Sequence, residues 1–280
     1  MKRFFVTIFF ILGISVCHAL EPQDSLLIAN ARWHTEVNSP KGIIFRQAHI
    51  DGLYGSVQSI SLVEIPHSRK FQFGIAGNKG LLKTSQQATE HNAMAAINGT
   101  YYNMRVGNST CFYKIDKEVI DSTLMGEFQG RVNGAIKERR GRLQIIPWNV
   151  DIEQMYSGKR GTVLASGPLL LRDGEVEEWS AFDPGFINTR HPRSVVYIKE
   201  DGTTVLLTVD GRSRGNASGM SIPELAQLVK ALGAVEAINL DGGGSTTLWI
   251  KDAGVVNYPC DNRRFDHEGE RSVSNVIYVK

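Results

Sequence analysis

Two aspartates each end an apolar run and are directly followed by glycine. Asp210 follows residues 206–209, and Asp241 follows residues 237–240. Apolar runs of this kind predict buried strands, and the glycine lets the backbone turn or approach a ligand closely. Because α/β sheets place ligands beyond the carboxyl ends of their strands, both carboxylates are candidates for acid–base chemistry. A lone Asp-Gly pair is also compatible with a simple hairpin turn.

The run that ends at Asp241 continues into three glycines and three hydroxyl residues. The segment is Gly242, Gly243, Gly244, Ser245, Thr246 and Thr247. Backbone N–H groups and hydroxyls in such a loop can hold an anion or sugar oxygens. Nucleotide hydrolysis is not expected, because the segment lacks the lysine of a phosphate-binding loop. Three successive glycines are costly in chain entropy, which favours a functional loop over a turn.

Two short segments concentrate guanidinium groups. Arg190, His191 and Arg193 lie close together before a strand, and Glu270 is directly followed by Arg271. The planar guanidinium fork matches two oxygens of a phosphate, so these segments could bind a phosphodiester. Exposed arginines are more often simply solvated, and that alternative stays open for each segment.

A polar amide and two tyrosines follow another short apolar run. Asn98 ends residues 95–97, and Tyr101 and Tyr102 come shortly after it. A tyrosine combines a flat apolar face with a hydroxyl, which suits a sugar ring. An ordinary core or surface position explains the tyrosines equally well.

The elements that must position these residues are mostly strands. Helices are expected at residues 85–95 and 221–232, the second with a capping box from Ser221 to Glu224 and Pro223 in its first turn. The 43–75 region, which alternates around 57–64, is expected to be a sheet edge or hairpin. Other runs predict strands at 112–120, 142–148, 194–198, 203–209, 235–240, 247–250 and 273–279. No internal repeat or composition break appears, so we expect one α+β domain with a large mixed, mostly antiparallel sheet and a few packed helices.

The composition is that of a folded globular protein. Of the 280 residues, 42% are hydrophobic and 21% are charged, which excludes a disordered or collagen-like chain. Lys and Arg number 31 against 29 Asp and Glu. Two of the basic residues lie in the leader described next, so the remaining chain is balanced and nucleic acid is not an expected partner.

Residues 1–19 have the pattern of a signal peptide, which leaves residues 20–280 as the domain. Lys2 and Arg3 precede an uncharged apolar run of thirteen residues, too short for a membrane span of about 20. Small residues at Cys17 and Ala19 favour cleavage nearby, so we expect an exported protein, periplasmic or secreted. A lipid anchor on Cys17 is the weaker alternative, since Val16 fits a lipobox poorly. No later segment is expected to span a membrane.

Two cysteines remain once the leader is removed. Cys111 and Cys260 would then lie in an oxidising compartment, and we predict a disulfide between them. Two unpaired thiols are the alternative, because spacing does not show that their Cα atoms approach.

Seven segments between residues 84 and 280 resemble, in this order, the phosphodiester glycosidase family. The glycine block is the most specific of them. Thr100 and Tyr102 stand where a small residue or glycine and a phenylalanine are expected. The segments are 96–102, 166–169, 190–194, 209–212, 219–221 with the helix to 232, 239–247 and 269–275.

The resemblance implies hydrolysis of a sugar-1-phosphodiester at its anomeric carbon. A phosphate monoester is already a good leaving group and needs charge stabilisation more than a proton. We expect Asp241 and Glu270 to act as base or nucleophile, with Asp210 supporting them or exchanging roles. The residues expected to bind substrate are Asn98, Tyr102, His191, Arg193, Arg212, Gly242, Gly243, Gly244, Ser245, Thr246 and Arg271.

Two other functions stay open. One is a non-catalytic exported module that binds phosphoglycans or a cell-envelope polymer. The other is a metal-dependent phosphodiesterase, with Asp210, Asp241, Glu270 and His191 as ligands. No His-x-His spacing is present, so no cofactor is predicted, although scattered oxygen ligands for calcium would leave no motif.

Overall fold

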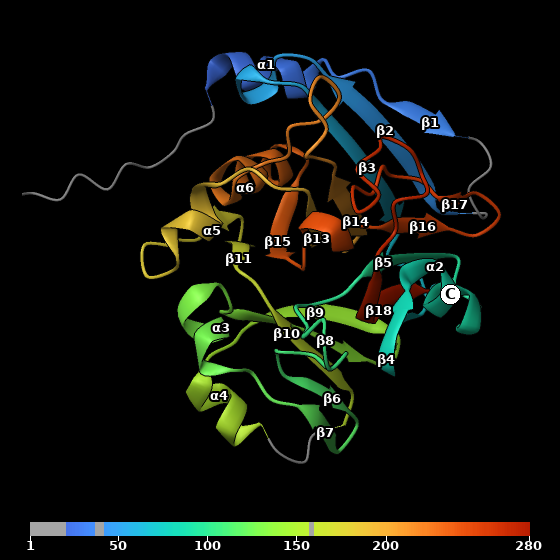
Figure 1. Ribbon diagram of the computed structural model, residues 1–280, viewed down its shortest axis with the longest axis vertical. Helices are drawn as coiled ribbons and strands as arrows, with labels where there is room; N and C mark the ends of the chain where they lie inside the picture. The colour runs from blue at the N-terminus through green and yellow to red at the C-terminus, as the bar shows by residue number, and fades with distance from the viewer. Residues whose placement is uncertain (1–20, 37–41, 157–159) are drawn as a thin grey trace, which may run out of the picture.

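The computed structural model describes residues 21–36, 42–156 and 160–280 (Figure 1). It has the expected α+β class, and every strand pair in the described residues is antiparallel. The strands divide among three sheets rather than forming one large sheet. The helices are α1 (Pro22–Ala29), α2 (Thr84–Glu90), α3 (Met125–Gly130), α4 (Val150–Met155), α5 (Pro184–Asn188) and α6 (Ile222–Ala231).

The largest sheet has eight strands, and two smaller sheets have five each. The order in the large sheet is β1 (His34–Glu36), β2 (Ile44–Ile50), β3 (Gln58–Ile65), β14 (Thr204–Val209), β13 (Arg193–Lys199), β15 (Ala234–Asn239), β11 (Leu169–Arg172) and β12 (Glu175–Val176). The order in one smaller sheet is β7 (Glu118–Asp121), β6 (Tyr113–Ile115), β10 (Thr162–Ser166), β8 (Gly134–Arg139) and β9 (Arg142–Pro147). The order in the other is β17 (Gly254–Val255), β16 (Leu248–Ile250), β5 (Ala95–Asn98), β18 (Ser272–Val279) and β4 (Phe73–Lys83).

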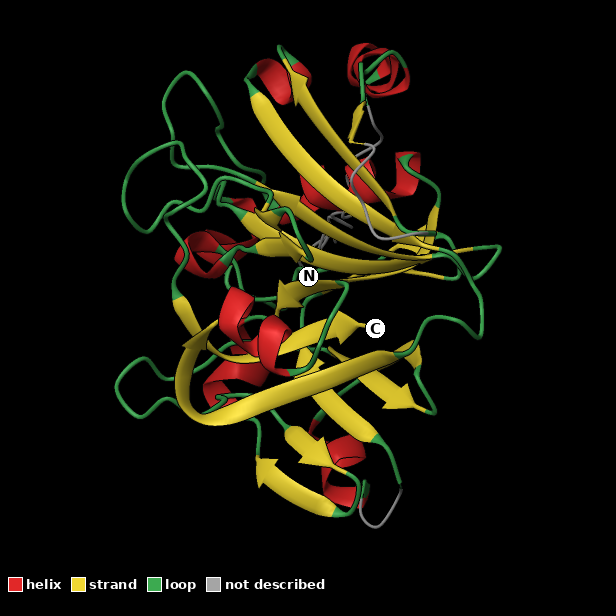
Figure 2. Ribbon diagram, turned by 90° about the vertical axis from the view of Figure 1, so that its right-hand side faces the viewer, coloured by secondary structure: helices red, strands yellow, loops and turns green. Residues whose placement is uncertain are grey.

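The eight-stranded sheet is buried on both faces. One face packs against strands of the smaller sheets, and the other against α1, α5 and α6. Figure 2 shows the strands stacked in layers, with β6 and β7 at the end of the molecule away from α1 in Figure 1. Of the two expectations for residues 43–75, the hairpin is found, because β2 pairs antiparallel with the next strand, β3. The sheet edge is not, since β3 lies between β2 and β14 with all eight residues buried.

Helix α6 begins as its sequence predicts. Ser221 accepts a hydrogen bond from the backbone of Glu224, and the Glu224 carboxylate accepts one from the backbone of Ser221 at 2.9 Å. Leu225, Leu228 and Val229 are buried against the large sheet. The expected hairpin of β13 and β14 is also present. Helix α2 ends at Glu90, so it is shorter than predicted.

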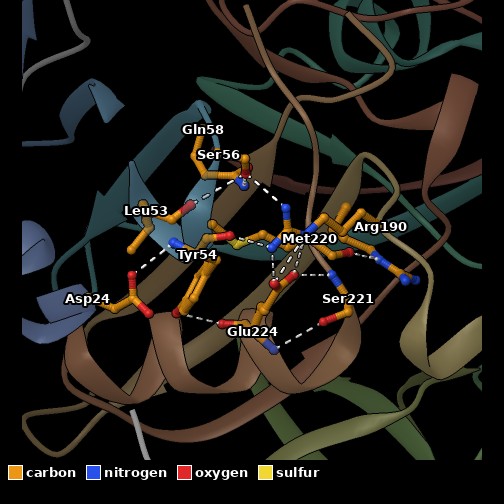
Figure 3. A network of polar contacts seen from close by, with 10 residues as sticks. Asp24, Leu53, Tyr54, Ser56, Gln58, Arg190, Met220, Ser221 and Glu224 are labelled. Carbon is orange, nitrogen blue, oxygen red and sulfur yellow. Dashed lines mark hydrogen bonds and ion pairs between the residues drawn. The ribbon is translucent and has the colours of Figure 1, made fainter. Parts of the chain in front are cut away.

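A polar network joins the first helix to α6 (Figure 3). The backbone N–H of Tyr54 donates to Asp24 at 2.8 Å, and the Tyr54 hydroxyl donates to the carbonyl of Glu224 at 2.9 Å. Arg190 forms an ion pair with the Glu224 carboxylate and donates to Ser56 at 3.0 Å. The Arg190 guanidinium is therefore committed to holding elements together.

The predicted signal peptide at residues 1–19, with Cys17, lies outside the described residues. Across the described ranges, no helix has the length and apolar character needed to cross a membrane.

The predicted disulfide between Cys111 and Cys260 is wrong, because both residues are free thiols. Cys111 is buried in an apolar cluster with Phe112 and Trp148. Cys260 lies in a different environment, partly exposed beside the charged side chain of Arg212.

Candidate active site

The ends of two strands from different sheets meet at Asp241. Its backbone N–H donates to the carbonyl of Gly99 at 3.1 Å, just beyond β5. The side-chain amide of Asn98 donates to the carbonyl of Asp241 at 2.7 Å. The amide oxygen of Asn98 accepts from Ser194 at 2.7 Å and from the backbone of Thr247 at 3.1 Å. Asn98 is buried and its amide is committed to these contacts, which favours a role in holding the site together over the predicted contact with a sugar.

Backbone and guanidinium atoms lie very close to the three glycines after Asp241. A Cβ on Gly242 would lie 2.4 Å from the carbonyl oxygen of Pro192. Gly243 has a φ of +62°, and its Cβ would lie 3.0 Å from the Arg212 guanidinium. A Cβ on Gly244 would lie 2.4 Å from the Arg271 guanidinium. Each glycine thus leaves space that a larger residue would fill, which a simple hairpin turn does not require.

Three hydroxyl residues complete the loop and are almost fully buried. Within the described chain, the hydroxyl oxygens of Thr246 and Thr247 have no hydrogen-bond partner. The Ser245 hydroxyl lies 3.4 Å from that of Tyr102 and contacts the Asp241 carboxyl. The Tyr102 hydroxyl also donates to the carbonyl of Ser272 at 2.9 Å. Tyr102 therefore fixes the loop from the β18 side.

The carboxyl of Asp241 has the electrostatics of a reactive group. Burial raises its pKa to about 6, against the lowering effect of a hydrogen bond from Ser245 and the charges of Arg131 and Arg271. Gly242 also donates its backbone N–H to this carboxyl at 2.9 Å. A carboxyl that titrates close to neutrality can exchange a proton during a reaction.

Two of the predicted arginines lie against the glycine loop. Arg212 is exposed, with one guanidinium nitrogen 3.4 Å from Nδ1 of His191, and no carboxylate of the described residues forms an ion pair with it. Arg271 pairs with Asp261, with Nε 3.0 Å from the carboxylate oxygen. Burial and the charges of Arg193 and Arg212 lower the pKa of His191, so its imidazole is neutral at pH 7.

Arg193 is placed differently from its prediction. It is 1% exposed and donates to the carbonyls of Met220, Thr189 and Phe186 at 2.9, 2.9 and 3.1 Å. Burial lowers its pKa to about 10, so it remains charged at pH 7. Its Nε and one terminal nitrogen are occupied by the backbone, which does not favour the predicted contact with phosphate.

Glu270 forms its hydrogen bonds with helix α2 and not with the glycine loop. Both of its carboxylate oxygens accept from Ser85, one from the backbone N–H and one from the hydroxyl, each at 2.7 Å. Ser85 is in the first turn of α2, where a carboxylate satisfies free N–H groups and the helix dipole. This arrangement does not favour Glu270 as base or nucleophile.

Asp210 is a buried carboxylate with three donors. It accepts from the Ser59 hydroxyl at 2.8 Å and from the Asn257 amide and the Tyr258 backbone at 2.9 Å each. Burial raises its pKa. The Asn257 amide also donates to the carbonyl of Thr246 at 3.1 Å, so Asp210 supports the glycine loop through one intermediate residue.

The residues suggested as cation ligands do not gather. In the described ranges, no group of three or more His, Cys, Asp or Glu side chains is arranged to hold a metal. Asp210 and Glu270 bond to separate protein groups, as described above.

Sequence reasoning missed three charged residues at the site, Arg131, Glu127 and Asp261. Arg131 forms an ion pair with Glu127, with Nε 2.6 Å from the carboxylate, and its charge acts on Asp241. The available signal was the spacing of Glu127 and Arg131, four residues apart, which places both on one helix face. That signal indicates an ion pair but does not show what the pair faces.

Comparisons with known proteins show which proteins this chain is similar to. The family model for phosphodiester glycosidase matches residues 91–280, which include Asn98 and the glycine loop. N-acetylglucosamine-1-phosphodiester alpha-N-acetylglucosaminidase from Mus musculus is 26% identical over 199 residues, covering 66% of this chain and 37% of that protein. The same enzyme from Bos taurus is 35% identical over 132 residues, covering 45% and 24%. The SPbeta prophage-derived protein YomE of Bacillus subtilis is 33% identical over 108 residues, covering 39% and 17%.

These matches show that the chain spans less than two fifths of the length of those relatives. Among solved structures, the zebrafish N-acetylglucosamine-1-phosphodiester alpha-N-acetylglucosaminidase catalytic domain, auto-inhibited by its pro-peptide, aligns with a TM-score of 0.66 at 19% identity, covering 89% of this chain and 87% of that one. A protein from Synechocystis aligns with a TM-score of 0.64 at 17% identity, covering 89% and 63%. At these identities, the structural likeness shows a shared fold.

Proposed function

This chain belongs to the phosphodiester glycosidase family, and on that premise we propose that it hydrolyses a glycosyl phosphodiester at the anomeric carbon. The products are a free sugar and a phosphomonoester. The observation that carries the proposal is the carboxyl of Asp241, with a pKa of about 6, beside a glycine loop that two guanidiniums approach closely.

The bond that breaks joins the anomeric carbon to the phosphate oxygen. The oxygen of water becomes bonded to the anomeric carbon, and the electron pair of the broken bond stays on the phosphate. This leaving group needs its growing negative charge stabilised more than it needs a proton. Arg212 is suited to that task, because it lies against Gly243 without a carboxylate partner in the described chain. Arg271 lies against Gly244 on the same loop.

Asp241 supplies the carboxylate that the reaction requires. Above about pH 6 it is ionised and can take a proton from the attacking water, or attack the anomeric carbon itself. The first route inverts the configuration of the sugar and the second retains it, so the anomer formed first tells them apart. Asp210 and Glu270 act in this account by holding neighbouring elements.

The loop hydroxyls are suited to the oxygens of the substrate. Thr246 and Thr247 carry buried hydroxyl oxygens with no partner in the described residues, which is unusual for groups that normally form hydrogen bonds. A phosphate or sugar oxygen bound at the loop would provide that partner.

Export is part of the proposed function and rests on the sequence of residues 1–19. Sequencing the N-terminus of the protein recovered from its native host tests it. Cleavage near Ala19 supports export, and an intact Met1 in a mature active protein contradicts it. A lipid on Cys17 would show that the protein stays anchored to a membrane.

A panel of α- and β-linked glycosyl-1-phosphodiesters tests the activity. The wild type, Asp241→Asn and the control Glu200→Gln, in the exposed turn after β13, are each assayed with and without EDTA. We expect free sugar and phosphomonoester from the wild type and the control regardless of chelator, and none from Asp241→Asn. Sugar-1-phosphate formed only with metal would establish a phosphodiesterase. Binding without turnover by all three proteins would establish a binding module.

A further inference from the structure

Arg131 lies in the connection between α3 and β8. It directly follows α3, and its guanidinium meets the carboxylate of Glu127 through two contacts, Nε at 2.6 Å and Nη2 at 3.0 Å. The Glu127 carboxylate also accepts a hydrogen bond from Thr110 at 2.8 Å. A two-pronged contact of this kind fixes the direction of the guanidinium plane as well as its place.

The ring of Tyr101 provides a second support. The guanidinium carbon of Arg131 lies 3.6 Å from the centroid of that ring. The Tyr101 hydroxyl donates to the carbonyl of Gly167 at 2.6 Å and accepts from the amide of Asn239 at 2.9 Å. Asn239 is the last residue of β15, two positions before Asp241. A continuous set of contacts therefore joins Arg131 to the strand that presents the reactive carboxyl.

The charged and titratable groups that act on Asp241 come from three segments, which follow α3, follow β5 and precede β18. Arg131 and Arg271 are the cations, and the phenols of Tyr101 and Tyr102 are the other titratable groups. Of the two cations, Arg131 has the larger lowering effect on the pKa of Asp241. Each of these arginines also forms an ion pair, Arg271 with Asp261 and Arg131 with Glu127.

Resting on the proposed function, we propose that Arg131 is a positioning residue for Asp241, held in place by Glu127 and by the ring of Tyr101, whose hydroxyl contacts Asn239 at the end of β15. A nearby guanidinium favours the ionised form of a carboxyl, while burial favours the neutral form. Arg131 thus extends the reactive, ionised state of Asp241 to lower pH. It also makes the connection between α3 and β8, which carries none of the predicted catalytic residues, part of the active site.

A direct titration of Asp241 tests this role. Protein labelled with ¹³C in its aspartate carboxyls is titrated by NMR, and Asp241→Asn assigns the signal. We expect the midpoint of Asp241 to move about one pH unit upward in Arg131→Gln, and by less than half of that in Arg131→Lys, which keeps the charge. Arg140→Gln, an exposed arginine after β8, is the control and leaves the midpoint unchanged. The acidic limb of kcat/KM moves by the same amount as the midpoint.

An unchanged midpoint in a folded Arg131→Gln protein would overturn the inference. If that variant does not fold, Glu127→Gln frees the guanidinium while keeping its charge, and an unchanged midpoint there would overturn it equally. The titration needs no substrate, so it stands even if no diester is hydrolysed. If the wild type hydrolyses a diester but the midpoint of Asp241 is unchanged in Arg131→Gln, the proposed function stands and Arg131 has no part in positioning Asp241.

Discussion

The side-chain amide of Asn98 lies 2.7 Å from the backbone carbonyl of Asp241 and donates a hydrogen bond to it. The two residues are far apart in sequence and belong to different sheets, since Asn98 ends β5 and Asp241 follows β15. The amide oxygen of Asn98 holds the backbone of Thr247 at 3.1 Å. One buried side chain thus fixes both ends of the glycine loop, and the catalytic account depends on this geometry.

Replacing Asn98 with aspartate tests the importance of that contact. Asn98→Asp keeps an acceptor for Thr247 and loses the donor to Asp241. We expect kcat to fall about 100-fold, because a shift of about 1 Å in a reacting group can cost that much. Steady-state kinetics of folded protein measures the loss. Activity within twofold of the wild type would show that Asn98 does not position Asp241.

Gly244→Ala tests the packing of Arg271 on the loop. The added Cβ would lie 2.4 Å from Arg271 and 2.6 Å from Asp261, so this flexible ion pair must move. We expect KM for the diester to rise about tenfold, since a hydrogen bond between Arg271 and the phosphate would contribute about 1.5–3 kcal/mol. We expect only a small change in the free energy of unfolding. Gly126→Ala, on α3 with open space around it, is the matched control. A wild-type KM in Gly244→Ala would separate Arg271 from phosphate binding.

Arg212→Ala tests the binding of phosphate by an arginine that has no carboxylate partner in the described chain. Its loss breaks no ion pair there, so the free energy of unfolding should change by less than about 0.5 kcal/mol. KM should rise about 10- to 100-fold. Arg214→Ala, an exposed neighbour, controls for net charge. Equal effects of the two substitutions would indicate general electrostatic attraction rather than a specific contact.

Asp241→Asn should make the protein more stable while abolishing its activity. The pKa of Asp241 is raised from 3.8 to about 6, so between these values the unfolded chain has lost a proton that the folded protein keeps. Stability therefore falls as pH rises through this window, and the cost is complete above about pH 6. We expect Asp241→Asn to exceed the wild type by about 1–3 kcal/mol at pH 7.5 and to match it below about pH 4.

Urea unfolding at several pH values measures this difference. A gap between the two proteins that does not depend on pH would show that the substitution acts through packing rather than through the ionised carboxylate.

The sequence predicts those parts of the molecule that depend on local pattern. The capping box at Ser221 and Glu224, the hairpin of β13 and β14, and the strand before Asp241 are all found. The loop of three glycines is also where Asp241, Arg212 and Arg271 come together. These features depend on propensities and turn chemistry within a few neighbouring residues.

The direction of a long side chain is not encoded locally. Arg193 and Arg212 are equally suited to phosphate by type, but Arg193 is buried against carbonyl groups and Arg212 is exposed. The family resemblance makes Glu270 a candidate base or nucleophile, yet its carboxylate bonds to Ser85 on α2. Such partners lie far away in sequence, so only the packing of the sheets decides between them.

The same reason explains the missed and mistaken assignments elsewhere. Arg131 lies in a region with little recognisable pattern, and its relation to Asp241 arises where separate sheets meet. The cysteine prediction rested on compartment and number, which do not determine whether two thiols approach. Cys111 is enclosed in a core cluster and Cys260 lies beside Arg212, so both remain free.

Hydrolysis in water enriched in ¹⁸O is the most direct test of the proposed reaction. With a glycosyl phosphodiester that the protein hydrolyses, we predict that the label enters the hydroxyl on the anomeric carbon of the sugar, and that Asp241→Asn forms no labelled product. Mass spectrometry of both products reads the result. Label in the phosphate instead would show that the P–O bond breaks, and would contradict attack at the anomeric carbon.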